Sequence, residues 1–393
     1  MKVAVIGIGQ CGCNIADEFY SLNQYAKSFL GRRLEIVTDT LAVNTDSSDL
    51  RGFKNIPGRN RILVGAGRTF GHGVGKINTE SARIFADERA VLAGEISRSK
   101  KFYETDAIVV IGSAAGGTGS GGIGQTVKVL KERLNRRVSR SVIAIVVLPF
   151  AYEESGVASY TLTNTATCLT TVDSYADVTF ILDNEKFSKG ASVSMAESYQ
   201  DINQKMVRNF YDLFCGGEEK GGKYIGAKVA DAGDIVASLT GISVIGRGEV
   251  SLPTFRFKKY SLDEGIRKAT SISTALSEAL CNLSTNINLE DARRLMAILC
   301  APKEYITQSA LQEIYQTLLD IAPSAEIRIG DYPRRRGEVS ITIVASELVS
   351  IPRVERIYEG AKKTFEAQQV IAGQTINLVN ELREKAKDIP RLA

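Results

Sequence analysis

The chain has 393 residues, which exceeds the usual size of one domain and predicts two. Hydrophobic residues make up 44% of the sequence and charged residues 24%, an ordinary globular composition that excludes disordered and fibrous classes. The net charge of +4 is small for this length. The sequence has no basic stripe interleaved with aromatic residues, so we expect no nucleic-acid partner.

The cysteines and the N-terminus predict a cytoplasmic protein. Six cysteines are scattered without a CxxC pair, which favours buried, reduced thiols over a disulfide framework. The N-terminus lacks the charged start and long apolar core of a signal peptide, and no run approaches the roughly 20 apolar residues that span a bilayer. The sequence contains one histidine, His72, which argues against a histidine-based metal site or catalytic triad.

The first half alternates apolar runs with helical patterns. The runs predict strands at Lys2–Ile6, Leu34–Val43, Ala107–Ile111, Ser141–Leu148 and Val178–Leu182. They are rich in β-branched residues and lack polar alternation, which is typical of strands buried on both faces of a mostly parallel sheet. The helical segments between them are Asn14–Leu30, Ile123–Asn135 and Leu162–Ser174. This order predicts a doubly wound α/β domain over residues 1–190.

Residues 191–216 predict a long central helix. Ser194 and Glu197 form a capping box, and apolar residues follow at steps of three and four until Gly216. The glycine- and charge-rich stretch Gly216–Gly226 is the predicted linker.

Residues 217–393 predict a smaller second domain of α/β or α+β type. Its helices are expected near Leu262–Asn282 and Gln308–Ile321, and its strands near Leu295–Cys300, Ala325–Ile329 and Val339–Ala345. Two further helices, at Pro352–Gln368 and Gln374–Lys387, are expected to close the chain and to pack against the body.

Two glycine-rich loops each follow a predicted strand and open a helix. The first, Gly7-Ile8-Gly9-Gln10-Cys11-Gly12, fits G-x-G-x-x-G, which a phosphate-binding loop or a dinucleotide-binding Rossmann domain would both produce. The second, Ser113-Ala114-Ala115-Gly116-Gly117-Thr118-Gly119-Ser120-Gly121-Gly122, has side chains small enough for backbone N–H groups to converge on an anion. Two such cradles on neighbouring strands predict a polyphosphate ligand.

The segment Gly116-Gly117-Thr118-Gly119-Ser120-Gly121 resembles the signature of the tubulin/FtsZ superfamily, which is GGGTGSG in tubulin. Five more motifs follow the family order: Gly9-Gln10-Cys11-Gly12, Asn44-Thr45-Asp46, Gly71-His72-Gly73-Val74-Gly75, Pro149-Phe150-Ala151-Tyr152-Glu153 and Asp183-Asn184-Glu185. The mixture of tubulin-like and FtsZ-like motifs looks like CetZ, the archaeal tubulin-like group associated with cell shape. The resemblance implies a GTP- and GDP-binding protein that hydrolyses GTP and polymerises head to tail.

The resemblance also implies which residues bind the nucleotide. Tyr199 would stack on the purine, Asn184 and Asn203 would hydrogen-bond its edge, and Glu153 would bind ribose. The full expected set is Gly9, Gln10, Cys11, Gly12, Asn14, Asn44, Asp46, Gly73, Val74, Gly75, Ala115, Gly116, Gly117, Thr118, Gly119, Ser120, Glu153, Asn184, Tyr199 and Asn203. Mg²⁺ would be held mainly by phosphates and water, with support from Gln10, Asp46 and Thr118.

Asp231 and Asp234 are the candidate catalytic residues. They are spaced i, i+3 at a predicted helix start, where ordinary capping would also place them. They match the two aspartates of the FtsZ motif NxDxxD, which act on the nucleotide of the neighbouring subunit. The resemblance therefore implies a homopolymer in which assembly completes the active site.

Four alternatives stay open from the sequence. An FtsZ-type division protein and a bacterial tubulin-like protein are the nearest. A nicotinamide-dependent dehydrogenase would explain the first glycine loop, and a filament protein could bind nucleotide without hydrolysing it. Any membrane association is expected to be peripheral, through an adaptor that the sequence does not identify.

Overall fold

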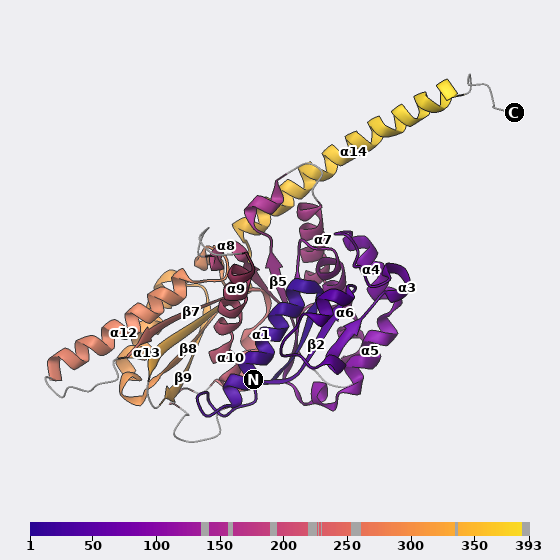
Figure 1. Ribbon diagram of the computed structural model, residues 1–393. Helices are drawn as coiled ribbons and strands as arrows, with labels where there is room; N and C mark the ends of the chain where they lie inside the picture. Colours follow the sequence, from indigo (N-terminus) through magenta and orange to yellow (C-terminus); the bar gives the residue numbers. More distant parts are fainter. Residues whose placement is uncertain are drawn as a thin grey trace.

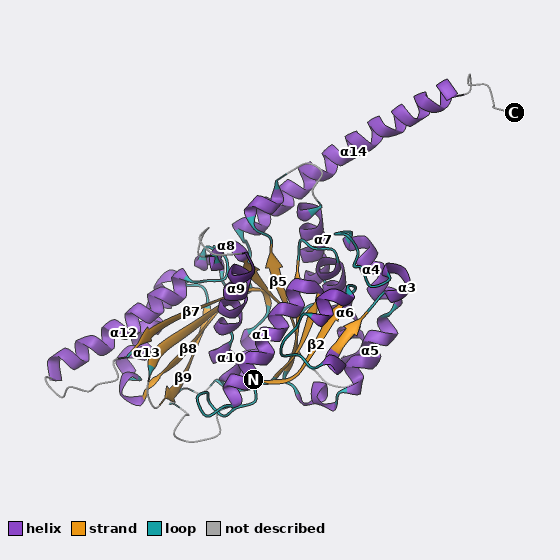
Figure 2. Ribbon diagram, viewed as in Figure 1, coloured by secondary structure: helices purple, strands orange, loops and turns teal. Residues whose placement is uncertain are grey.

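A computed structural model describes residues 1–134, 141–155, 160–188, 195–218, 226, 228, 230–252, 261–334 and 337–386. A ten-stranded mixed sheet runs through it in the order β3-β2-β1-β4-β5-β6-β7-β10-β8-β9 (Figure 1). Helices cover both faces of the sheet (Figure 2). The predicted cap Ser194, most of the predicted linker and the predicted boundary after residue 190 lie outside the described residues, so the division into domains stays a prediction.

The first six strands are all parallel, as predicted. They are β1 (Val3–Ile8), β2 (Val37–Asn44), β3 (Arg61–Leu63), β4 (Ala107–Ser113), β5 (Ser141–Leu148) and β6 (Val178–Asp183). The helices among them are α1 (Gly9–Lys27), α2 (Ser47–Arg51), α3 (Ala66–Thr69), α4 (Asn78–Asp87), α5 (Arg89–Arg98), α6 (Thr118–Leu134), α7 (Thr161–Asp173) and α8 (Asn184–Phe187). Three 3-10 turns, η1 (Gly58–Asn60), η2 (Lys100–Glu104) and η3 (Ala151–Glu154), complete this half.

Alternate residues of each strand pack into different cores. Val3 and Val5 face α1 and the central helix, whereas Ala4 and Ile6 face α4, α6 and α7. Burial on both faces explains why these strands show no polar alternation.

The predicted central helix is interrupted once. It consists of α9 (Met195–Asn209) and α10 (Tyr211–Cys215), and the break falls at Phe210. The Phe210 ring is buried and packs edge-to-face against Phe180 of β6, with 5.1 Å between ring centroids, and lies 5.8 Å from the Phe19 ring of α1. The central helix is thereby fixed against the parallel half of the sheet.

The second half extends the same sheet. It contains β7 (Gly241–Ser251), β8 (Arg294–Pro302), β9 (Glu326–Arg334) and β10 (Glu338–Ser346), with α11 (Ala232–Ser238), α12 (Ser261–Cys281), α13 (Gln308–Ile321) and the turns η4 (Leu289–Asp291) and η5 (Lys303–Tyr305). Strand β7, which the sequence did not predict, pairs in parallel with β6 and antiparallel with β10. Its glycines made the segment look unlike a strand in the sequence. A Cβ on Gly246 would lie 2.2 Å from the Ala279 oxygen of α12, so close helix packing requires glycine there.

The C-terminal segment is one helix, α14 (Pro352–Ala386), and the prediction of two helices is wrong. No proline follows Pro352 within it, and each of its two glycines, Gly360 and Gly373, costs the helix only about 1 kcal/mol. Its first turns pack as expected, since Ile357 and Ala361 are buried and α14 contacts α7. The packing prediction fails further along, because Phe365 and Val370 are exposed and the helix projects from the body (Figure 1). In the part of the chain that the structure describes, we find no helix with the length and apolar character of a membrane span.

Candidate nucleotide site and separate acidic pair

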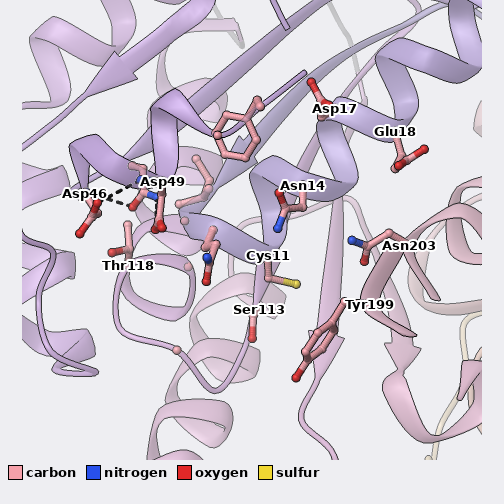
Figure 3. A pocket seen from close by; sticks show the side chains of 18 of the residues that line it. Cys11, Asn14, Asp17, Glu18, Asp46, Asp49, Ser113, Thr118, Tyr199 and Asn203 are labelled. Atoms are coloured by element: carbon pink, nitrogen blue, oxygen red, sulfur yellow. Dashed lines mark hydrogen bonds between the residues drawn. The ribbon is translucent and has the colours of Figure 1, made fainter. Parts of the chain in front are cut away.

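A cavity of about 830 Å³ opens where β1 and β4 end side by side. Its walls come from both glycine loops, α1, the segments after β2 and β5, and α9 (Figure 3). Most of the predicted nucleotide-binding residues line it: Gly9, Gln10, Cys11, Asn14, Asn44, Asp46, Gly73, Ala115, Gly116, Gly117, Thr118, Gly119, Glu153, Asn184, Tyr199 and Asn203. Gly12, Val74, Gly75 and Ser120 are not part of this lining among the described residues.

Gly12 and Ser120 contribute to the packing of the two loops. A Cβ on Gly12 would lie 2.2 Å from the Ile111 oxygen, so glycine lets α1 lie directly against β4. The Ser120 hydroxyl turns back and donates to the Gly116 carbonyl oxygen. Both residues shape the cradle from behind.

The glycine loops place two helix N-termini at one cavity. Helix α1 begins at Gly9, whose φ of +70° favours glycine, directly after β1. Helix α6 begins at Thr118, five residues after β4 ends. The N–H groups and the positive dipole ends at the start of both helices would attract a phosphate chain there. This geometry supports the predicted polyphosphate ligand.

A third loop is held against the second glycine loop. A Cβ on Gly117 would lie 2.6 Å from Val74 Cγ2, so the approach of the two loops requires glycine. The Asn164 side-chain amide, on α7, donates to the carbonyl oxygens of Lys76 (2.9 Å) and Gly116 (3.2 Å). Asn164 is buried, and sequence reasoning missed it. The sequence gives little signal for it, because α7 is rich in threonine and buries Thr161 and Thr165 beside Asn164.

Oxygen ligands gather at the phosphate end of the cavity. Asp46 caps α2 by accepting from the N–H groups of Ser48 and Asp49, and the Thr118 hydroxyl lies 2.6 Å from that of Thr45. Burial, followed by the charge of Asp46, raises the pKa of Asp49 although an Asn44 hydrogen bond opposes the shift. A divalent cation would relieve this repulsion, and hard oxygen donors suit Mg²⁺. Within the described ranges no cluster of three acidic, histidine or cysteine side chains could hold a metal by itself.

The opposite end of the cavity presents an aromatic ring and several amides. Tyr199 and Asn203 lie one turn apart on α9, and Asn14 of α1 points toward the same space (Figure 3). Asn184 begins α8, which Asp183 caps by accepting from the Glu185 N–H at 3.1 Å. Burial raises the pKa of Cys11 to about 12, so its thiol beside Glu153 stays neutral. A purine bound at this end could stack on the aromatic ring and form hydrogen bonds with the amides.

The acidic pair lies elsewhere. Asp231 is the N-cap of α11 and accepts from the Asp234 N–H at 2.8 Å, while the Asp234 carboxylate accepts from the Asp231 N–H at 3.3 Å. Both side chains are exposed, and neither belongs to the cavity lining. Their segment is fixed by β9, because the buried Tyr332 hydroxyl donates to the Ala230 carbonyl oxygen at 2.5 Å. Within one chain, the acidic pair is therefore not part of the cavity.

Comparison with known proteins agrees with this architecture. The model of the tubulin/FtsZ family GTPase domain matches residues 2–192, and that of the C-terminal domain of tubulin-like CetZ proteins matches residues 192–363. CetZ1 of Haloferax volcanii is 30% identical over 388 residues, covering 94% of this chain and 93% of that protein. The chain therefore belongs to the tubulin/FtsZ family of GTPases and, within that family, to the CetZ group.

Solved structures share the fold. CetZ1 from Haloferax volcanii, described as a GDP-bound monomer, has a TM-score of 0.78 and 28% identity, covering 94% of this chain and 100% of that one. CetZ2 from the same organism, described as a GTPγS-bound protofilament, has a TM-score of 0.78 at 23% identity and the same coverage. The family assignment excludes the dehydrogenase that the first glycine loop alone favoured.

Proposed function

We propose that this protein binds GTP in the cavity, polymerises head to tail, and hydrolyses the nucleotide at the junction between subunits. The observation that carries the proposal is the separation of the two half-sites, since Asp231 and Asp234 do not line the cavity of their own chain. A neighbour stacked along the filament would bring its acids to the γ-phosphate. Phosphoryl transfer depends on positioning and charge stabilisation, so assembly would switch hydrolysis on.

The Mg²⁺ ion would bind mainly to the phosphates and to water. Asp46, Gln10 and Thr118 are the side chains that we expect to support it, and Lys76 adds positive charge to the same lining. The ion would neutralise charge on the β- and γ-phosphates. Asn14, Asn184, Tyr199 and Asn203 would select guanine, and Glu153 would contact ribose.

We further propose a cytoplasmic, cytoskeletal role in cell shape, on the strength of membership of the CetZ group. The solved protofilament of CetZ2 supports polymerisation as the form of assembly. Recruitment to the membrane by an adaptor stays a prediction.

Phosphate release measured against protein concentration, with pelleting in parallel, tests the shared site. The rate per molecule should rise where polymer appears, and a flat rate would contradict the proposal. Asp231→Asn and Asp234→Asn are better variants than alanine, because asparagine can still cap α11. Both should pellet with GTP but lose most hydrolysis; normal turnover in both would rule out catalytic roles for them.

A further inference from the structure

Arg353 lies in the first turn of α14 and reaches into the GTPase half of the molecule. It is 7% exposed. Its guanidinium donates to both carboxylate oxygens of Glu154, at 3.0 and 2.5 Å, and to the Pro149 carbonyl oxygen at 3.1 Å. A planar guanidinium that grips a carboxylate through two parallel bonds fixes its orientation as well as its position. Arg353 therefore holds the turn from Pro149 to Glu154 at both ends.

The same guanidinium also contacts the segment after β6. Its Nε lies 3.4 Å from Asp183 Oδ2, and the other oxygen of Asp183 caps α8. The first residue of α8 is Asn184, which lines the cavity. One buried cation thus links the two segments that carry Glu153 and Asn184.

A further hydrogen bond joins the two segments, and another fixes Glu153 within its own turn. The Ala151 N–H donates to Glu185 Oε1 at 2.7 Å, and Glu153 Oε2 accepts from the Phe150 N–H at 3.0 Å. The Phe150 ring packs edge-to-face against Tyr199, with 5.9 Å between centroids. A shift of the turn would therefore displace the ring on which the purine is expected to stack.

The charges show why the arginine matters. Burial raises the pKa of both Glu154 and Asp183, and the positive charge of Arg353 offsets part of each shift. Without this cation, the buried Asp183 and the partly buried Glu154 would remain near each other, with the smaller effect of the Arg356 charge to offset their burial. Breaking a buried pair from one side is strongly unfavourable, so the turn would move to hydrate them.

We propose that Arg353 is a positioning residue for the sugar and base end of the nucleotide cavity, and that the seating of α14 thereby sets nucleotide affinity. The inference rests on the proposed function. It concerns one end of the cavity only, because the glycine loops that would hold the phosphates make no part of this contact.

The test compares GDP with inorganic pyrophosphate, both titrated by calorimetry into the full chain. Arg353→Met removes the charge, Glu154→Gln breaks the same pair from its other side, and Lys363→Met removes an exposed cation from the same helix. We expect the first two variants to bind GDP about tenfold more weakly or worse, with pyrophosphate affinity unchanged. The double variant should be no weaker than either single one, and Lys363→Met should match wild type.

Each other outcome overturns the inference. GDP affinity at the wild-type level in Glu154→Gln, or in Arg353→Met, shows that the pair does not position the site. Equal losses for GDP and pyrophosphate show a general structural role. Wild-type protein that binds pyrophosphate but not GDP would instead contradict the proposed guanine nucleotide site, and the inference would fail with it.

Discussion

The proposed purine site takes its side chains from three separate elements. Tyr199 and Asn203 come from α9, Asn184 from α8, and Asn14 from α1. The Tyr199 side chain is 38% exposed, with its ring braced by Phe150 on one side and open to the cavity on the other. That combination gives a ring whose orientation is fixed before the ligand arrives, which lowers the entropy cost of binding.

Tyr199→Ala should weaken GDP binding by about tenfold to a hundredfold, since base–aromatic stacking contributes roughly 1–3 kcal/mol. Tyr315→Ala is the matched control, because Tyr315 is similarly exposed (43%) but lies on α13 in the other half of the molecule. Titration of a fluorescent GDP analogue measures both. Unchanged affinity in Tyr199→Ala would mean that the ring is only part of the aromatic packing around Phe150.

Among individual residues, the sequence predicted those features that depend only on spacing along the chain. Tyr199 and Asn203 share a helix face because they are four residues apart, and the glycine loops follow from their small side chains. Asn164 and Arg353 could not be predicted, because each acts through contacts with segments far away in the chain. Their partners become visible only once the fold brings α7 and α14 to the site.

The phosphate end of the cavity is built from loops that the helices behind them hold in place. Asn164 of α7 bridges the loop after α3 and the loop after β4. Ser81 of α4 adds a hydrogen bond to the Thr118 carbonyl oxygen at 3.0 Å. Loops held in this way need little rearrangement to accept an anion, so α4 and α7 support the site although neither helix lines the cavity.

Asn164→Ala should destabilise the fold by about 1–3 kcal/mol, because it removes the hydrogen bonds to Lys76 and Gly116 and a buried one to the Ala115 carbonyl oxygen at 3.3 Å. It should also weaken pyrophosphate binding, which distinguishes it from the Arg353 variants. Thr167→Ala, on the exposed face of α7, is the control. Urea unfolding and pyrophosphate titration would detect both effects. Wild-type pyrophosphate affinity would show that the loops keep their positions without Asn164.

Element prediction failed where tertiary packing overrides local signals. Strand β7 contains glycines that look like turn residues, yet they are required by the close approach of α12. The break at Phe210 in the central helix reflects aromatic packing across three elements. By contrast, β1, β4, β5 and β6 are buried on both faces, and their composition alone predicted them.

A buried ion network joins the two halves of the molecule. Asp212 of α10 is 0% exposed and pairs with Arg32, which follows α1, and with Arg247 of β7 at 3.0 Å. The Ser340 hydroxyl of β10 donates to the same carboxylate at 2.9 Å. Burial alone would raise the pKa of Asp212, but the two arginines outweigh it and hold the pKa well below its usual range. The central helix is thereby anchored to both halves.

Asp212→Asn should destabilise the protein by about 3–5 kcal/mol, because it removes the buried negative charge that faces Arg32 and Arg247. Arg247 keeps its ion pairs with Glu249 and Glu338 in this variant. Asp320→Asn, at an exposed position of α13, is the control. Because the pKa of Asp212 is lower in the folded state than the ordinary value of 3.8, its ionised carboxylate stabilises the fold at pH values above 3.8. This stabilisation is lost progressively as the pH falls below that value. The stability difference from wild type should therefore be constant near neutral pH and shrink below about pH 4. Equal urea midpoints at pH 7 would contradict the assigned role.

A mixing experiment tests most directly whether two subunits share one active site. Gly116→Asp adds a negative charge to the phosphate cradle, where no atom lies within 4 Å of the new Cβ, and leaves the acids intact. Asp234→Asn removes one of the acids and leaves the phosphate cradle intact. Each variant alone should release phosphate slowly. We predict that mixing the two restores clear GTP hydrolysis, because the acids of one subunit then face the nucleotide of the other. A mixture no more active than its separate components would contradict the shared site.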